Sequence, residues 1–313
     1  MIEGLRAFLA VFEGQSLSKA ADKLSLTQSA VSRRIQQLEV TLGGALFDRS
    51  SKPLKPTPLA HRIHARAREL LRNAEELFAL ANVESEPTGT LRLGVTHAIG
   101  DVVSLSLLTR LKTEFPALDV QLCSDWTVGL LQKIDAAQVD AAVVMFAAGI
   151  RPPAYLEVRS LATLHAVVIQ SRKAPVFTGS TTLAGLTRQN WILNAKGCGY
   201  RDAFVREMHS RGVDMRICVE SQSIDEQLRF IASGLGLGLI SREFLYHGTG
   251  KYEVSIVDVR DFLQPISLCL VHVNGLGSLT KTLDAMSVTI DETLSRLAQG
   301  NNLAVSCVAA DNR

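Results

Sequence analysis

The sequence predicts a chain of three parts: a small, mostly helical N-terminal domain, one long helix, and a larger α/β domain of two lobes. Three observations predict this order. Apolar residues recur at helical spacing over the first 83 residues, a polar segment with Pro87 and Gly89 follows at 84–90, and strand and helix patterns alternate from residue 91. With 313 residues, the chain is long enough for two domains.

Three helices are predicted in the N-terminal part, at residues 3–13, 17–24 and 27–42. The first helix places its apolar side chains inward: Leu5, Phe8, Leu9 and Phe12. The second helix has apolar residues at positions i, i+3, i+4 and i+7: Leu17, Ala20, Ala21 and Leu24. The third begins with Thr27 as its cap and has its own apolar face: Val31, Ile35, Leu38 and Leu42. The short interruption after the second helix predicts a tight turn between the two.

The opposite face of the third helix carries hydrogen-bonding and positively charged side chains, and no carboxylate precedes Glu39. Gln and Arg pair with base edges in a major groove, and Ser reaches phosphates. This pattern favours a helix-turn-helix whose second helix reads DNA. The predicted DNA-contacting residues are Thr27, Gln28, Ser29, Ser32, Arg33 and Arg34. The alternative is a helix pair that serves only as core.

A small wing is predicted after the third helix, which ends at Gly43-Gly44. An extended segment starts at Leu46, turns at residues 49–53 and returns through residues 54–57. Arg49, Lys52 and Lys55 lie where a wing meets phosphates or the minor groove, although a solvated turn would carry the same residues. Pro56 cannot donate to a strand ladder, so a short second wing strand is expected.

A long helix over residues 58–83 begins with Pro58, a favoured residue in a first turn. It keeps a heptad of apolar positions, which is typical of a helix that packs on a partner helix. The predicted dimer seam consists of Ala60, Ile63, Ala67, Leu70, Ala74, Leu77 and Ala81. The alternative is that this helix packs on its own protein body.

The remaining chain alternates strands and helices, which predicts a parallel sheet with helices on both faces. The first set comprises strand 91–95, helix 99–111, strand 120–123, helix 128–136 and strand 141–145. The second set comprises strands near 164–169, 191–193, 217–219 and 238–240, with helices 202–211 and 224–233. Strand 266–271 is expected to return to the first lobe, before a last helix at 279–297 and a tail at 300–313 without regular structure.

The segment LTQSAVSRRIQQLEVTLGGALFDR at 26–49 resembles the signature of LysR-type transcriptional regulators, L-T-Q-x-A-V-S-R-x-I-x-x-L-E-x-x-L-G-x-x-L-F-x-R. AQVDAAVV at 137–144 and ASGLGLGLIS at 232–241 resemble blocks of that family's effector domain, with Ala137 and Ser241 in place of the usual Gly and Pro. The resemblance implies a winged helix-turn-helix at 1–57, a linker and dimerisation helix at 58–83, and a hinge at 84–90. It implies a periplasmic-binding-protein-like effector domain at 91–299, with lobe I at about 91–162 and 266–299 and lobe II at about 163–265.

The resemblance also implies a function: promoter binding that a small molecule, commonly a carboxylate in this family, modulates from a cleft between the lobes. Ligands of α/β sheets bind beyond the carboxyl ends of strands, near helix N-termini. The loops at these ends nominate Thr96, His97, Asp125, Thr127, Met145, Phe146, Cys198, Gly199, Tyr200 and Ser221. Each threonine or serine would alternatively serve as a simple helix cap. The implied partners are double-stranded promoter DNA, the effector, further copies of the chain as a homodimer or homotetramer, and RNA polymerase for an activator.

Charge and composition are consistent with this interpretation. Residues 1–83 contain 12 Lys and Arg against 8 Asp and Glu, a net +4, while the whole chain carries +2 and the remainder therefore −2. A basic head on a slightly acidic body suits a nucleic-acid-binding end. The sequence has no run of about 18 apolar residues, so no membrane span is predicted. The N-terminal residues predict a first helix rather than a signal peptide. A cytoplasmic protein is expected.

Two other functions are considered. A thiol switch at Cys198 is the first, because GCGYRD resembles the peroxide-sensing branch of the same family; the reactive cysteine of that branch aligns one residue later, at Gly199. A small-molecule enzyme fused to a DNA-binding module is the second. The sequence shows no HxxxH, no GxSxG and no acid–histidine cluster at strand ends. Neither catalysis nor a bound cofactor or metal is expected.

Overall fold

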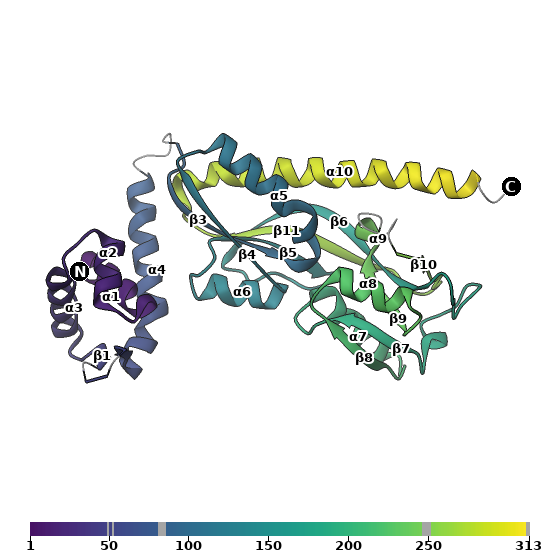
Figure 1. Ribbon diagram of the computed structural model, residues 1–313, viewed down its shortest axis with the longest axis horizontal. Helices are drawn as coiled ribbons and strands as arrows, with labels where there is room; N and C mark the ends of the chain where they lie inside the picture. Colours follow the sequence, from purple (N-terminus) through teal and green to yellow (C-terminus); the bar gives the residue numbers. More distant parts are fainter. Residues whose placement is uncertain (49, 52, 81–85, 246–251, 311–313) are drawn as a thin grey trace. The chain divides into compact units, whose positions relative to one another are not determined.

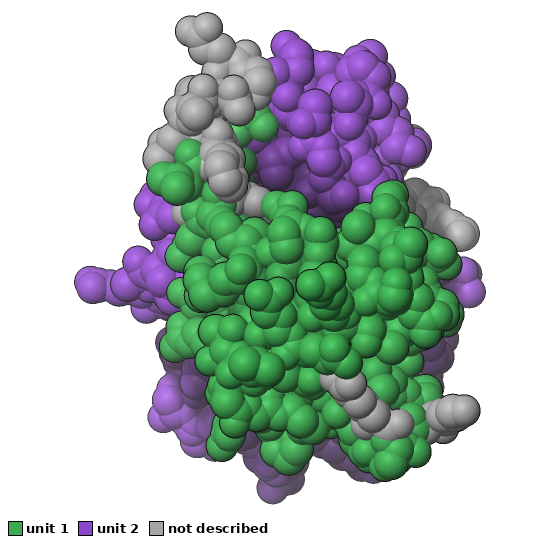
Figure 2. All heavy atoms as spheres, turned by 90° about the vertical axis from the view of Figure 1, so that its left-hand side faces the viewer, with its two compact units in different colours: residues 1–85, 135–138, 275–278 green, residues 86–134, 139–274, 279–313 purple. Residues whose placement is uncertain are grey.

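The computed structural model describes residues 1–48, 50–51, 53–80, 86–245 and 252–310 (Figure 1). The chain divides into two compact units, coloured separately in Figure 2. Unit 1 consists of residues 1–85, 135–138 and 275–278, and unit 2 of residues 86–134, 139–274 and 279–313.

Unit 1 is a helical domain with a two-stranded wing. Its elements are α1 (Ile2–Gly14), α2 (Leu17–Leu24), α3 (Gln28–Leu42), β1 (Phe47–Asp48), β2 (Lys55–Pro56) and α4 (Pro58–Leu80). Ser16 caps α2 by accepting the Lys19 N–H at 3.4 Å, and Thr27 caps α3 by accepting the Ala30 N–H at 3.2 Å. The predicted apolar faces form its core, which includes Leu5, Phe8, Ala20, Ala21, Val31, Ile35 and Leu38. The winged helix-turn-helix and its short second strand are therefore confirmed.

The long helix α4 packs partly on its own unit. Ala60 and Ala67 are buried in the core of unit 1, and Ile63 packs against it. Ala60 and Ala67 are therefore unavailable to a partner helix, which corrects their assignment to a dimer seam, whereas Ile63 is only partly buried and its assignment stays a prediction. Leu70 is 46% and Leu77 68% exposed, so only the later turns of α4 offer an apolar surface. Ala81, the last residue of the predicted seam, lies outside the described residues.

Unit 2 is built on one sheet in the order β4-β3-β5-β11-β6-β9-β7-β8, with β10 beside β6. Pairs among β3, β4 and β5 and among β7, β8 and β9 are parallel, as predicted. The two long strands β6 and β11 run antiparallel to each other and join the two parallel groups. The strands of the first group are β3 (Gly89–Thr96), β4 (Leu118–Asp125) and β5 (Ala141–Ala147). Those of the second group are β7 (Asn190–Asn194), β8 (Arg216–Ser221) and β9 (Leu237–Ser241).

Helices follow most strands of the two parallel groups. They are α5 (His97–Glu114), α6 (Thr127–Asp135), α7 (Gly199–Ser210), α8 (Ile224–Ala232) and α9 (Arg242–Leu245), followed by α10 (Thr280–Ala310). The joining strands are β6 (Leu156–Ser171), β10 (Val254–Ile256) and β11 (Gln264–Val273). The helices α5 and α10 lie side by side along the first group of strands (Figure 1). A core of apolar residues from β6, β7, α8 and β9 fills the second group, including Ile169, Ile192, Leu228, Ile231 and Ile240.

Two elements are longer than the sequence predicted. Strand β6 has 16 residues rather than the six at 164–169, because it pairs with β11 over its first part and with β9 over its last. Helix α10 continues through Ala310, which corrects the expectation of an irregular tail from residue 300. Gly300 weakens a helix by only about 1 kcal/mol relative to Ala, so a single glycine does not end this one. Residues 311–313 lie outside the described part.

Replacing Ala137 by Gly is expected to stabilise the fold. Ala137 has φ 51°, a left-handed conformation that costs a residue with a Cβ about 1–2 kcal/mol. Glycine removes this strain but has more unfolded-state entropy, so we expect a net gain of about 0.5–1 kcal/mol in the free energy of unfolding. Urea denaturation measures it. Ala136→Gly, one residue earlier, is the control and should destabilise; equal effects of the two changes would contradict the strain at Ala137.

Candidate nucleic-acid interface and ligand cleft

One face of α3 is exposed and rich in hydrogen-bonding groups. Val31, Ile35 and Leu38 are buried on its inner side, while the outer side presents Gln28, Ser29, Ser32, Arg33, Gln36 and Gln37, with Ser32 half-buried. Ser18 donates to Gln28 Oε1 at 3.4 Å, which ties the start of α2 to the start of α3. The only acid of α3, Glu39, accepts the Leu46 N–H at 2.8 Å and so faces the wing. The outer face therefore presents donors and one positive charge without a carboxylate.

The adjacent arginines of α3 have different surroundings. The guanidinium of Arg34 lies 2.8 Å from Glu3 Oε2, so this side chain joins α3 to α1. Arg33 is exposed on the outer face. Both were predicted to contact DNA; only Arg33 is placed with the other base-reading candidates.

The wing is ordered by a carboxylate. Asp48 accepts the Ser50 N–H at 2.9 Å, the Ser50 hydroxyl at 2.6 Å and the Ser51 hydroxyl at 2.7 Å. The hydrogen bonds from Ser50 and Ser51 lower the pKa of Asp48 to about 2. Lys55 is exposed and stands opposite Asp48 in the two-stranded register. Arg49 and Lys52, the other predicted wing contacts, lie outside the described residues.

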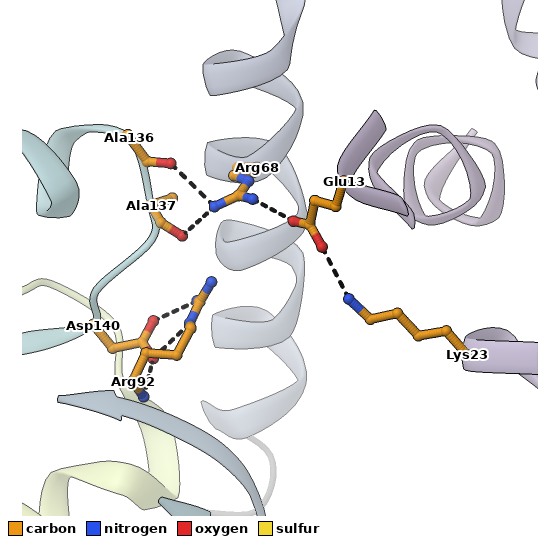
Figure 3. A network of polar contacts seen from close by, with 7 residues as sticks. All are labelled: Glu13, Lys23, Arg68, Arg92, Ala136, Ala137 and Asp140. Atoms are coloured by element: carbon orange, nitrogen blue, oxygen red, sulfur yellow. Dashed lines mark hydrogen bonds and ion pairs between the residues drawn. The ribbon is translucent and has the colours of Figure 1, made fainter. Parts of the chain in front are cut away.

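Charged groups also fix α1 and α2 against α4 within unit 1 (Figure 3). Glu13 of α1 pairs with Arg68 of α4 and, at 2.9 Å, with Lys23 of α2. Burial raises the pKa of Glu13, but the hydrogen bond from Lys23 and the charge of Arg68 outweigh it and leave the pKa below its usual value. Arg68 Nη1 also donates to the carbonyls of Ala136, at 3.2 Å, and Ala137, at 2.8 Å, both in unit 1. These contacts hold the helix-turn-helix in a fixed orientation on the first half of α4.

In unit 2, the predicted ligand loops come together. The ring of His97, which follows β3, meets Trp126, which follows β4, at 4.9 Å between centroids. The Trp126 indole N–H donates to Gln222 Oε1, beyond β8, at 2.8 Å. The Val128 N–H faces the Gly197 carbonyl at 3.4 Å. Loops from both groups of strands thus contact one another.

Thr96, one of the residues predicted to bind the effector, has a side-chain hydroxyl without a hydrogen-bond partner within the described chain. Its side chain is 2% exposed. It stands at the N-cap of α5 and makes no side-chain cap bond to that helix. A buried hydroxyl without a partner is unfavourable, and the first turn of a helix presents unpaired N–H groups. The start of α5 therefore suits an anion.

Three other predicted residues are already engaged. Thr127 Oγ1 donates to the Met145 carbonyl at 3.0 Å and tethers α6 to β5. Ser221 donates to Glu226 Oε2 at 2.6 Å. Asp125 pairs with Lys133 and accepts the Trp126 N–H at 2.7 Å. Because Lys133 neutralises its charge, Asp125 is a weak obstacle to an anion bound beside it.

The predicted residues Cys198 and Tyr200 are buried. Cys198 is 2% and Tyr200 1% exposed, and Asn194 Nδ2 donates to the Tyr200 hydroxyl at 2.6 Å. Burial raises the pKa of the Cys198 thiol to about 11, so the thiolate needed for a redox switch is scarce at neutral pH. At Gly199, an added Cβ would lie 2.6 Å from the Met145 carbonyl oxygen, which explains the glycine. Met145 and Phe146 are themselves buried in β5.

Trp126 and Gln222 lie in loops that the sequence nominated for ligand binding, but the sequence did not single out these two residues. Their bond joins positions 96 residues apart, and neither residue type at a strand end has a specific signature. Among the described residues, no group of three or more His, Cys, Asp or Glu side chains is arranged to hold a metal ion. Within the same part of the chain, no helix is long and apolar enough to cross a membrane.

Comparison with known proteins identifies the family of both parts of the chain. Residues 2–61 match the model of the bacterial regulatory helix-turn-helix proteins of the lysR family, and residues 84–277 match the LysR substrate binding domain. The HTH-type transcriptional regulator CysL of Bacillus subtilis is 24% identical over 86% of this chain and 89% of its own length. The regulator YeiE of Escherichia coli strain K12 is 29% identical over 77% of this chain and 80% of its own.

Solved structures share the fold. A full-length cysteine-to-aspartate variant of OxyR from Pseudomonas aeruginosa superposes with a TM-score of 0.75 at 19% identity, covering 93% of this chain and 94% of that one. The LysR family regulator CbnR gives a TM-score of 0.56 at 17% identity, with 93% and 99% coverage. The two matched family models together span most of the sequence. The helix-turn-helix model matches residues of unit 1, and the substrate binding domain model matches mostly residues of unit 2. The chain therefore belongs to the LysR family of DNA-binding transcriptional regulators with an effector-binding domain.

Proposed function

We propose that the effector of this regulator is a small carboxylate that binds at the start of α5. The observation that carries the proposal is the buried, unpartnered hydroxyl of Thr96 at the N-terminus of an 18-residue helix. The unpaired N–H groups and the positive end of the helix dipole attract an anion, and the hydroxyl supplies a further hydrogen bond. His97 and Trp126 form the neighbouring wall.

Promoter DNA is the second ligand. Gln28, Ser29, Ser32 and Arg33 would enter the major groove, with Lys55 of the wing on a phosphate. The exposed Leu70 and Leu77 of α4 support a partner helix from another copy. In such a dimer, or a dimer of dimers, two recognition helices would read half-sites about 34 Å apart. Because promoter DNA is its target, the protein would act in the cytoplasm. If it is an activator, it would also contact RNA polymerase.

Regulation requires the carboxylate to bind one arrangement of the oligomer more tightly than another. Occupation of the cleft would then shift the spacing of the DNA-binding pairs rather than create or abolish DNA binding. The family assignment favours this role over catalysis, and the buried Cys198 thiol favours a ligand over an oxidant as the signal.

The test is a genomic footprint of the full-length protein at fixed salt, repeated with the carboxylates that the enzymes encoded beside the bound sites consume or produce. We expect a few dyad sites whose protected length or position changes with one carboxylate. Binding that depends only on salt, or sites that no carboxylate alters, would contradict the proposal.

A further inference from the structure

The sheet of unit 2 has β4 at one end and β8 at the other, yet the loops that follow these two strands touch. Trp126 follows β4 and Gln222 follows β8, and the indole N–H donates to the amide oxygen at 2.8 Å. The contact between Val128 and Gly197, at 3.4 Å, is longer and correspondingly weaker. The Trp126–Gln222 bond is thus the stronger of these two contacts across the cleft.

This bond lies beside the proposed anion site. Trp126 packs edge-to-face on His97, the residue that follows Thr96. Trp126 is only 6% exposed, and the Thr96 hydroxyl is buried although nothing in the described chain bonds to it. Both the Thr96 side chain and the Trp126 indole are therefore shielded from solvent where Trp126 packs on His97. Gln222 is exposed, so its side chain can leave the indole without unfolding the lobe.

We infer that Gln222 and Trp126 form a latch that keeps the cleft closed in the effector-free protein and so controls access to Thr96. Gln222 is a positioning residue, since it acts by holding the indole against His97. A neutral hydrogen bond between such groups has a small net strength, which allows thermal opening. The inference rests on the proposed function only in taking Thr96 as the ligand site, because the bond between Trp126 and Gln222 does not depend on where a ligand binds.

The two tryptophans of the chain make the latch measurable. Trp191 is fully buried, so Trp191→Phe leaves Trp126 as the sole indole fluorophore. In this background Gln222→Leu removes the acceptor, and we expect acrylamide to quench Trp126 several-fold more efficiently than in the parent. Gln222→Glu keeps an acceptor for the indole N–H and should restore the low quenching of the parent. Gln132→Leu, at an exposed position of α6, is the matched control.

Hydrogen exchange of the backbone amides at residues 97–100, measured in the chain that retains Trp191, gives a second readout. These amides should exchange faster in Gln222→Leu and at the parent rate in Gln222→Glu and Gln132→Leu. Unchanged quenching and exchange in Gln222→Leu would overturn the latch, and so would equal increases in the Leu and Glu variants. These experiments use no carboxylate, so a wrong ligand site at Thr96 would leave their results as they are.

Discussion

Replacing Arg33 by Ala is expected to abolish specific promoter binding while leaving the protein folded. Arg33 is exposed on the outer face of α3, away from the buried side that packs in the core. A bidentate contact between Arg and guanine contributes about 1–3 kcal/mol of discrimination, so each recognition helix should lose about 5- to 150-fold in affinity. In a dimer that uses two such helices, the two losses of affinity multiply. Anisotropy titration of a footprinted promoter fragment at fixed salt measures it.

Arg34 is the matched control, because it is the same residue type one position later on the same helix. Its ion pair with Glu3 is partly exposed, so Arg34→Ala should lower the free energy of unfolding by at most about 1 kcal/mol. We expect it to weaken promoter binding far less than Arg33→Ala does. Equal losses of affinity in the two variants, or normal binding by Arg33→Ala, would contradict the assignment of the outer face of α3 to base reading.

The helices could be predicted from the sequence because their inner faces repeat at a fixed period. Val31, Ile35 and Leu38 are buried where that period places them. The partner of an apolar stripe does not follow from its period. Ala67 and Leu70 belong to the same heptad of α4, yet Ala67 is buried in its own unit and Leu70 is 46% exposed. The stripe on α4 was therefore predictable, whereas its division into residues buried in unit 1 and residues left exposed was not.

Prediction of the ligand-binding residues from the sequence has a similar limit. Parallel strands end at one edge, so the topology predicts which loops meet, and these loops do contact one another. Thr96, Thr127 and Ser221 all lie at or just beyond strand ends and look alike in the sequence. Their hydroxyls differ in which groups stand within hydrogen-bonding distance, and the fold sets those surroundings. Only Thr96 of these three lacks a partner within the described structure.

That difference gives opposite expectations for two equivalent substitutions. Thr96→Val replaces a buried, unpartnered hydroxyl by a methyl group of similar size. It should leave stability unchanged or raise it by about 1 kcal/mol, because burying a polar group without a partner is unfavourable. Promoter binding should remain, whereas the change of footprint with the carboxylate should be lost. The measurements are urea denaturation and footprinting with and without that carboxylate.

Thr127→Val is the comparison, since the hydroxyl of Thr127 bonds to the Met145 carbonyl and lies 3.3 Å from the Met145 N–H. Its loss leaves buried backbone groups of β5 without a partner, so this variant should lose about 1–3 kcal/mol of stability. The Thr127 hydroxyl bonds within the fold and therefore stabilises the protein in the absence of ligand. The Thr96 hydroxyl has no such bond within the described residues, so it is expected to contribute only when a ligand is bound. If Thr96→Val destabilised the protein as much as Thr127→Val, or responded normally to the carboxylate, the anion site would have to lie elsewhere in the cleft.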